Sequence, residues 1–566
     1  MTKFKIINKV NLQFFIGFLL IIILSFTNLD INLKSLIFLT ILIYFYFVQE
    51  NSEFRFLLES LNYRYFYLSI LFFTLIIYQN YYLNFEIISI DVPSYLVASR
   101  TESFFELPFL TQWESKGPIF IYLYRILLIL SNENYLIFRL LNDVLLFIIT
   151  FLIYLISFEK SKNNFRAFCS CLIFILITSH VWYVTELSEI YCLVFILFQY
   201  LILSKYSITK FSIFSSGILI SISSLINQST AIFLIGVCFF IYYFQKLKNI
   251  STYFYLFFGF ITPHISFFLL YLLNDLSIIY ITNYITIPFG YVGTGKFEIY
   301  ELTVWLRRYF QYNQLLYFSI IGLTFISFLE FFRRKTFGIF NNLVNIIYLF
   351  SGFLIYVIAG HNYEHHLFYA IAFFSIYVSQ LNFDKSIFLI CMILFISSLQ
   401  ILNTTFEKSF NNLVNYEQTY ENYPLNQLSK EIKTYFTDDD FNVLAVDHVL
   451  LLYYLEKPNI SYIIHPFNNF EEYIVKALLD TQILKTNDFS HLSYYIETEP
   501  DIVICAAQTI IDGSPTKLGG DIFNCEVTDY KKNYMKINTE YFRSNPNREY
   551  YYNPYISIDL FIKNKE

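Results

Sequence analysis

The sequence predicts a polytopic α-helical membrane protein with about thirteen transmembrane helices, followed by a small soluble α/β domain at the C-terminal end. Three observations support this fold class: few charged residues, a series of long apolar runs, and a more polar final segment. Of the 566 residues, 56% are hydrophobic and 14% are charged. Soluble domains usually carry about a quarter charged residues, so a water-soluble fold is disfavoured for most of the chain.

The charge balance argues against a nucleic acid partner. The formal net charge is -6, and the chain has no tract of Lys and Arg that could bind phosphates along a nucleic acid backbone. The 51 Tyr and 67 Phe are spread along the whole sequence, which indicates a compositional bias rather than a base-stacking surface.

Apolar runs that can cross a bilayer occupy most of residues 1–402. The first follows Lys3, Lys5 and Lys9 and has no small-residue cleavage site behind it, so we interpret it as an uncleaved signal anchor. The predicted spans are 12–28, 33–49, 66–84, 136–157, 167–184, 189–204, 211–226, 230–244, 251–272, 315–332, 342–359, 366–381 and 386–402.

The positive residues of the short loops predict the orientation. If the N-terminus is cytoplasmic, the short basic clusters around Lys160, Lys205, Lys246, Arg333 and Lys385 all lie inside, as the positive-inside rule requires. The long loops 85–135 and 273–314 then lie outside. With thirteen spans the C-terminal domain is also extracytoplasmic, and the expected location is the inner (cytoplasmic) membrane.

The final segment, 403–566, alternates amphipathic stretches with short apolar runs, a pattern typical of a small α/β domain. Its amphipathic stretches include 425–436 and 470–479, and its apolar runs include 443–446 and 502–505. Cys505 and Cys525 lie in this segment and could form a disulfide in an oxidising compartment.

Ionisable residues gather on the predicted outer face of the membrane. Because a charged side chain is costly near hydrocarbon, such residues are candidates for function. They come from four separate regions: Asp91, Arg100, Glu102, Glu114 and Lys116; His180, Glu186 and Glu189; Lys296, Glu298, Glu301, Arg307 and Arg308; and His361, Glu364, His365 and His366.

These residues resemble the pattern of the GT-C superfamily of membrane glycosyltransferases, which includes protein mannosyltransferases and aminoarabinose transferases. In that family the first outer loop carries an Asp, a nearby Tyr, and an acidic residue before a Lys-Pro-Pro or Lys-Gly-Pro turn. The counterparts here are Asp91, Tyr95 and the run Glu114–Pro118. Arg139 and Glu189 match later family positions. The chain departs from the family at two places: Asn227-Gln228 lacks the expected Lys, and His365-His366 stands where the family has a His-Tyr pair.

The resemblance implies an inverting glycosyltransferase that moves a sugar from a polyprenyl-phosphate-linked donor to an extracytoplasmic acceptor, which could be a lipid, a protein or a glycan. Asp91 is the expected catalytic base, and we expect partial burial to raise its pKa towards a useful value. Lys116 is the expected phosphate contact, since a cation stabilises the charge that grows on the leaving group. The predicted substrate-binding residues are Tyr95, Glu114, Lys116, Arg139, Glu189, Arg307, Arg308, His361, His365 and His366.

Several alternatives stay open. The three histidines could ligate a divalent metal ion, but substrate contact or hydrogen bonding is the favoured interpretation, so no metal ligand is assigned. Glu114 and Lys116 could form a simple surface ion pair, and Arg139 could pair with Asp143 one helical turn away. The protein could instead be an oligosaccharide ligase or polymerase of the cell envelope, a transporter or flippase, or an assembly factor. A transporter would place ionisable residues near mid-membrane, whereas here they gather at one face.

Overall fold

The computed structural model describes the chain between residues 64 and 564, with gaps. Outside the described part lie the predicted spans 12–28, 33–49 and 386–402 and nearly all of 315–332. The described segments are 64–80, 83, 85–87, 89, 91–100, 103–179, 186–205, 209–245, 250–292, 297–304, 321–322, 324–325, 338–360, 363–380, 406–436, 440–484, 495, 498–506, 509–511, 514–516, 534–538 and 558–564.

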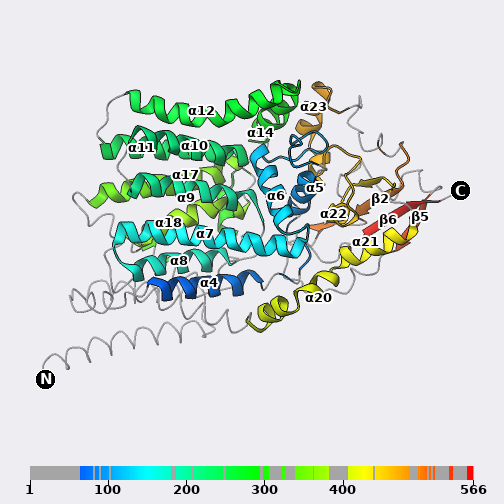
Figure 1. The fold of residues 1–566 in the computed structure, drawn as a ribbon, viewed down its shortest axis with the longest axis horizontal. Helices are drawn as coiled ribbons and strands as arrows, with labels where there is room; N and C mark the ends of the chain where they lie inside the picture. The colour runs from blue at the N-terminus through cyan, green and yellow to red at the C-terminus, as the bar shows by residue number, and fades with distance from the viewer. Residues whose placement is uncertain are drawn as a thin grey trace.

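The other predicted spans fold as helices that lie side by side along the long axis of the molecule (Figure 1). Three of them, α7, α9 and α12, are both long and apolar enough to cross a membrane. The chain is thus a helical membrane protein. The bundle helices are α4 (Arg64–Asn80), α7 (Tyr135–Ser161), α8 (Asn164–Thr178), α9 (Ser188–Lys205), α10 (Lys210–Ile226), η2 (Gln228–Ile232), α11 (Phe233–Gln245), α12 (Ile250–Leu272), α17 (Gly338–Ala359), η4 (Glu364–Leu367) and α18 (Phe368–Val378).

Small residues let two bundle helices approach closely. A Cβ atom on Gly217 of α10 would lie 2.4 Å from the Leu256 carbonyl oxygen of α12, and one on Gly259 would lie 2.1 Å from the Phe214 oxygen. Glycine is therefore needed at both positions, as is common where membrane helices pack through their backbones. The other side of α12 exposes large apolar side chains, including Phe254, Phe257 and Phe258, as a surface that faces lipid would.

The first long loop, predicted at residues 85–135, is itself helical. It contains α5 (Asp91–Ser99) and the apolar helix α6 (Pro118–Leu130), and both lie across the end of the bundle (Figure 1). With 13 residues, α6 is about 20 Å long, too short to cross the hydrocarbon layer. The Arg125 guanidinium of α6 donates hydrogen bonds to the carbonyl oxygens of Ser99 (3.2 Å) and Phe104 (3.1 Å), which holds the loop against the helix.

The C-terminal segment combines helices with a mixed sheet of order β1-β2-β6-β5, in agreement with the predicted α/β pattern. Strands β1 and β2 are parallel, and the other neighbouring pairs are antiparallel. A second sheet pairs β3 with β4. The elements are α20 (Tyr416–Glu421), α21 (Pro424–Tyr435), β1 (Val443–Ala445), α22 (Leu450–Leu455), η5 (Phe467–Phe470), α23 (Glu472–Asp480), β2 (Ile502–Ala506), β3 (Thr509–Ile511), β4 (Ser514–Thr516), β5 (Tyr534–Asn538) and β6 (Ile558–Lys563).

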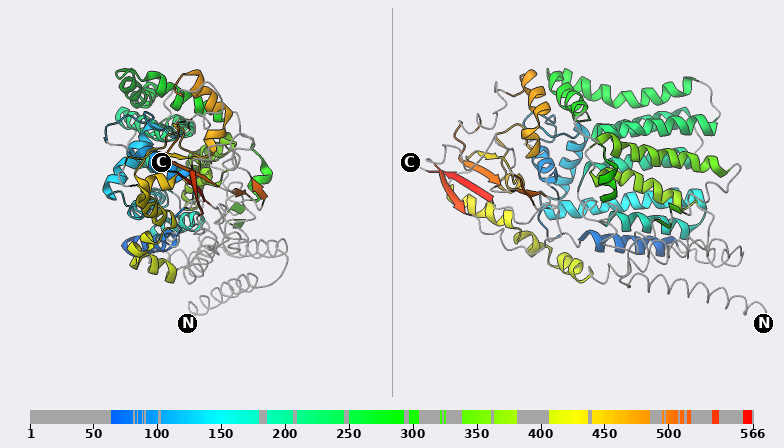
Figure 2. Two further views of the ribbon diagram at one scale, coloured as in Figure 1. Left: turned by 90° about the vertical axis from the view of Figure 1, so that its right-hand side faces the viewer. Right: turned by 180° about the vertical axis from the view of Figure 1, so that it is seen from behind.

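This segment packs directly on the membrane-embedded part of the chain. It lies at the end of the bundle, beyond α5 and α6 (Figure 2). One hydrophobic core includes Leu71 of α4 and Ile149 of α7 together with Leu425 of α21 and Ile502 of β2. One hydrophobic core thus crosses the boundary that the sequence predicts at residues 402 and 403, and a smaller core that includes Leu444 and Phe561 lies within the C-terminal segment.

A carboxylate from the first loop caps a helix of the C-terminal segment. Glu86 accepts hydrogen bonds from the backbone N–H groups of Leu425 (2.9 Å) and Asn426 (3.1 Å) in the first turn of α21. These N–H groups have no partner within their own helix, so the distant carboxylate replaces a local cap. Burial raises the pKa of Glu86 to about 7, against the lowering effect of the two backbone hydrogen bonds.

Candidate functional site

Asp91 begins α5 and forms a hydrogen bond with a residue 374 positions away. Its Oδ1 lies 2.8 Å from Nε2 of His465, whose side chain is 9% exposed. The pair joins the first outer loop to the C-terminal segment.

Backbone pairing brings His465 to this place. Ile463 and Trp113 form an isolated parallel bridge, in which Trp113 N–H donates to the Tyr462 oxygen at 2.7 Å and Ile464 N–H donates to the Trp113 oxygen at 3.3 Å. The Asn469 amide then donates to the carbonyl oxygens of Ile463 (3.2 Å) and His465 (3.1 Å) and fixes the turn that follows.

The environment of Asp91 corrects one expectation from the sequence. Burial raises the pKa of Asp91, as expected, but the hydrogen bond and charge of His465, with smaller effects from Lys116 and His365, lower it more. The net pKa lies below the usual value, so Asp91 is a carboxylate at neutral pH. Burial lowers the pKa of His465, yet the bond to Asp91 more than offsets this and leaves it raised.

The run Glu114–Pro118 forms a tight turn before α6. Gly117 N–H donates to the Ile226 carbonyl oxygen at 3.0 Å, and a Cβ on Gly117 would lie 2.1 Å from the Leu225 oxygen. The turn is thus pressed against the end of α10, and Pro118 occupies the first position of α6, which a proline favours. Lys116 follows Ser115 in this turn, with Nζ 6.0 Å from the centre of the Tyr95 ring.

Glu114 is buried rather than part of a surface ion pair. Its side chain is 1% exposed, and Oε1 accepts hydrogen bonds from the backbone N–H (2.6 Å) and hydroxyl (2.8 Å) of Ser115. Burial raises the pKa of Glu114, and the nearby charge of His465 and the bonds from Ser115 act in the opposite direction. Tyr95 is also buried, and the charges of Asp91 and Glu114 act on its hydroxyl.

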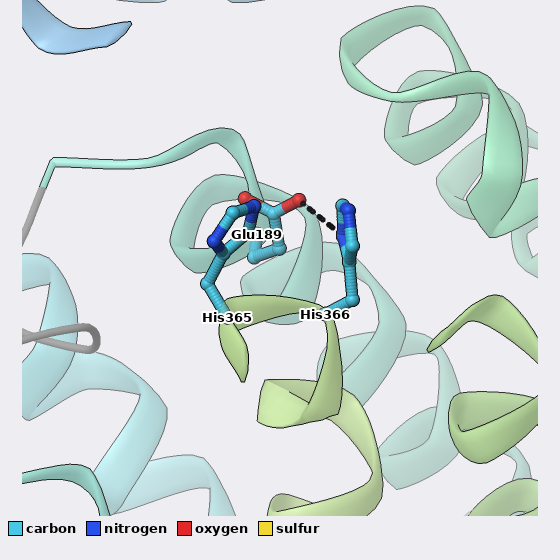
Figure 3. Close-up of side chains that lie close together, drawn as sticks. All are labelled: Glu189, His365 and His366. Atoms are coloured by element: carbon cyan, nitrogen blue, oxygen red, sulfur yellow. Dashed lines mark ion pairs between the residues drawn. The ribbon is translucent and has the colours of Figure 1, made fainter. Parts of the chain in front are cut away.

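A second cluster, Glu189 with His365 and His366, lies close to the first. Figure 3 shows the two imidazole rings on either side of the Glu189 carboxylate. One ligand atom of each residue lies within 4.8 Å of the others, and Nδ1 of His366 is 3.3 Å from Oε1 of Glu189. All three side chains are buried, and the charges of Lys116 and His365 act on Glu189. The positive charge of Lys116 therefore acts on both clusters.

Neighbouring side chains orient Glu189. The Asn227 amide donates to Oε1 at 3.2 Å, and the Ser188 hydroxyl donates to Oε2 at 3.2 Å. His365, in the connection between α17 and α18, has its pKa lowered to about 3, chiefly by burial. Its imidazole is thus neutral, the form in which a ring nitrogen can accept a proton or a metal ion.

Arg139 contacts other residues of the protein. Its guanidinium donates to the Phe85 carbonyl oxygen at 2.7 Å and lies 3.3 Å from the Glu186 carboxylate, and both charged side chains are buried. A third contact is the Tyr423 hydroxyl at 3.3 Å. This arrangement gives Arg139 a role in joining α7, the first loop and the C-terminal segment.

The remaining predicted site residues, Arg307, Arg308 and His361, lie outside the described part of the chain. The structure therefore brings together Asp91, Tyr95, Glu114, Lys116, Glu189, His365 and His366, whereas the contacts described for Arg139 are to Phe85, Glu186 and Tyr423. Sequence reasoning missed His465. The only local signal is a histidine that ends the apolar run 462–464 directly before Pro466.

A polar cavity of about 460 Å³ lies elsewhere, between the first loop and helices α21 and α22. Arg100 and Glu133 form an ion pair of 2.6 Å there, and Lys433 and Glu456 add charges from the C-terminal segment. Among the residues that line it are none of those around Asp91 or Glu189, so we assign it to the junction between these parts rather than to the site.

The fold is similar to that of a solved transferase of the GT-C superfamily, the superfamily that the sequence resembles. One solved structure with this fold is ArnT from Cupriavidus metallidurans, an aminoarabinose transferase, bound to undecaprenyl phosphate. It has a TM-score of 0.54 and 9% sequence identity, over 77% of this chain and 93% of that chain.

Two structures of oligosaccharyltransferase from Archaeoglobus fulgidus are more distant. One is tethered to an acceptor peptide (TM-score 0.40, 13% identity, 79% of this chain and 70% of that chain). The other, AglB, is in complex with an inhibitory peptide and a dolichol-phosphate (TM-score 0.42, 13% identity, 78% and 69%). No family model and no curated protein sequence matches the chain.

Proposed function

We propose that this protein transfers a sugar from a polyprenyl-phosphate-linked donor to an acceptor on the extracytoplasmic side of the inner membrane, with inversion at the anomeric carbon. The observation that carries the proposal is that the charge of Lys116, in the turn before α6, acts on the carboxylate of Asp91, the first residue of α5. A carboxylate beside a cation can serve both the acceptor hydroxyl and the departing phosphate. The fold shared with an undecaprenyl phosphate-bound transferase supports a lipid-linked donor.

In the proposed reaction the acceptor hydroxyl gives its proton to the Asp91 carboxylate while its oxygen attacks the anomeric carbon. The bond from that carbon to the phosphate oxygen breaks, and the electron pair leaves with the phosphate. Lys116 stabilises the charge that grows on this phosphate, as a compact cation suits a phosphate oxygen. No acid is needed, because the phosphate leaves as an anion.

Tyr95 and Glu114 bind the substrates beside the Lys116 turn. Arg307 or Arg308 is a second contact for the phosphate, and His361 contacts a substrate. The acceptor is a lipid, a protein or a glycan. The C-terminal segment, residues 403–566, is extracytoplasmic in this proposal.

The experiment compares surface glycans and glycolipids of cells that lack the protein, express it, or express Asp91→Asn, by mass spectrometry. We expect one sugar mass to depend on the wild-type protein and to be absent with Asp91→Asn, together with accumulation of the lipid-linked sugar. If the glycans of cells with and without the protein differ by the mass of several sugars, the protein is instead an oligosaccharide ligase or polymerase. Identical glycans and lipid-linked pools in all three strains would refute sugar transfer.

A further inference from the structure

The cluster of Glu189, His365 and His366 has the composition of a metal site. Two imidazoles and one carboxylate are a ligand set that zinc and other divalent transition metals bind in proteins. Mg²⁺ and Ca²⁺ prefer oxygen ligands, so the two nitrogens disfavour them. The three ligand atoms lie within 4.8 Å of one another, close enough for a single ion to contact all of them after small side-chain rotations.

A second observation points to a bound group. Nδ1 of His365 is buried and has no hydrogen-bond partner, although its side chain lies beside a carboxylate. A buried polar atom without a partner costs about 1–3 kcal/mol, and a metal ion would remove that cost. The carboxylate is already oriented by Asn227 and Ser188, the kind of supporting contacts that metal ligands usually have.

We propose that Glu189, His365 and His366 bind a divalent transition metal ion. Lys116 faces the same cluster, and its positive charge opposes cation binding when the site is otherwise empty. A donor phosphate placed between Lys116 and the metal would neutralise both cations, so metal and donor should bind cooperatively. This last role rests on the proposed function, whereas the metal site itself does not.

The test measures metal content without any transfer assay. The full chain is purified without a polyhistidine tag, exposed to Zn²⁺ or Mn²⁺, desalted, and analysed by elemental mass spectrometry. We expect about one equivalent of metal in the wild type and a loss of more than about tenfold in Glu189→Gln and His366→Asn, since each removes one of three ligands. The matched control is His448→Gln, a buried histidine of the C-terminal segment, which should keep the wild-type content.

A rescue variant separates metal loss from misfolding. His366→Asp keeps a ligand atom, so it should bind metal and its melting temperature should rise when Zn²⁺ is added. The melting temperature of His366→Asn should not change on adding Zn²⁺. Wild-type protein without bound metal, or a metal content equal in the wild type, Glu189→Gln and His366→Asn, would overturn the proposal. Sugar transfer that persists in a metal-free wild type would overturn only the role at the phosphate.

A different observation, the hydrogen bond between the C-terminal segment and Asp91, carries a second proposal. We propose that His465 is a positioning residue that fixes the orientation and ionised state of Asp91. The backbone bridge from Trp113 to Ile463 holds His465 in register with the loop that precedes Lys116. The C-terminal segment thus completes the site from outside the membrane-embedded part.

The pH profile of transfer distinguishes this role from simple packing. Asp91 must be ionised to accept a proton, and His465 favours the ionised form, so His465→Gln should move the acid limb of the rate profile to higher pH. The other titratable groups that interact with Asp91 stay unchanged in this variant. In the described part of the chain they are Lys116, His365, Glu114, Tyr95, Tyr124, Tyr291 and Tyr363.

His465→Ala and the control His448→Gln, which changes another buried histidine of the C-terminal segment, complete the experiment. We expect His465→Ala to lower kcat more than it raises KM and to shift the acid limb, whereas His448→Gln leaves the profile in place. If His465→Gln keeps an unshifted acid limb, the positioning role is wrong, whatever happens to its rate. The site around Asp91 and the sugar transfer itself would remain, because the wild-type glycan analysis tests them separately.

Discussion

At the scale of single residues, the chemistry depends on whether charged side chains act on substrate or on each other. Lys116 stands in the turn before α6, and its charge acts on Asp91. Among the described residues, no carboxylate forms an ion pair with Lys116, whose ammonium lies 6.0 Å from the centre of the Tyr95 ring. In contrast, the Arg139 guanidinium forms hydrogen bonds with Phe85 and Tyr423 and an ion pair with Glu186.

Asp91→Asn keeps the size of the side chain but removes the proton acceptor. If Asp91 is the base, transfer should fall by about 100- to 10,000-fold, measured as kcat with the purified full chain. The matched control Asp480→Asn changes an exposed carboxylate at the end of α23 and should leave the rate unchanged. An Asp91→Asn protein that keeps more than about a tenth of the wild-type rate would contradict the base assignment.

Lys116→Ala should instead act on the donor. Loss of a cation beside a phosphate weakens its binding and the stabilisation of the leaving group, so KM for the donor should rise and kcat should fall. Lys116→Arg restores the charge and should recover part of the activity. A variant that affects only the acceptor KM would place Lys116 on the wrong substrate.

At the scale of elements, the turn before α6 is set by a close backbone approach. Gly117→Ala would push a methyl group against the Leu225 carbonyl, which is backbone and cannot rotate away. We expect a loss of about 1–3 kcal/mol in the free energy of unfolding and a reduced rate of transfer, since the turn carries Lys116. Gly290→Ala is the control: its Cβ would meet the Tyr473 side chain, which can move, so a smaller change in melting temperature is expected.

The cap of α21 predicts a pH dependence of stability. The pKa of Glu86 is raised to about 7 by burial, above its value of about 4.5 in the unfolded chain. A carboxyl with a raised pKa stabilises the fold below about pH 4.5, and this contribution is lost as the pH rises through about 7. Glu86→Gln cannot ionise, so its melting temperature should fall less than that of the wild type between pH 5 and pH 8.

Melting temperatures of both proteins in the same detergent, at several pH values, test this prediction. Glu421→Gln replaces an exposed carboxylate at the end of α20 and should keep the wild-type pH dependence. Equal slopes in the wild type and Glu86→Gln would show that the carboxyl does not titrate in this range.

At the scale of the whole molecule, the orientation in the membrane decides whether the site faces the proposed substrates. Ser103→Cys places a thiol on an exposed part of the first loop, and Lys162→Cys places one at the opposite end of α7. A membrane-impermeant thiol reagent should label position 103 in intact cells and position 162 only after permeabilisation. Labelling in the reverse order would place the site in the cytoplasm and remove the proposed acceptors.

The sequence by itself determined the fold class and most of the site. In hydrocarbon, the backbone N–H and C=O groups of a long apolar run find hydrogen-bond partners only within a helix, so α7, α9 and α12 could be located from composition. Charged side chains are costly near hydrocarbon, which made Asp91, Lys116 and Glu189 candidates for function. The tertiary structure decided which of these residues meet. It brought His465 to Asp91 across 374 positions, buried Glu114, and gave Arg139 protein partners instead. The physical reason is that periodicity and burial cost are local properties of the chain. Contacts such as the bridge from Trp113 to Ile463 depend on how distant segments pack.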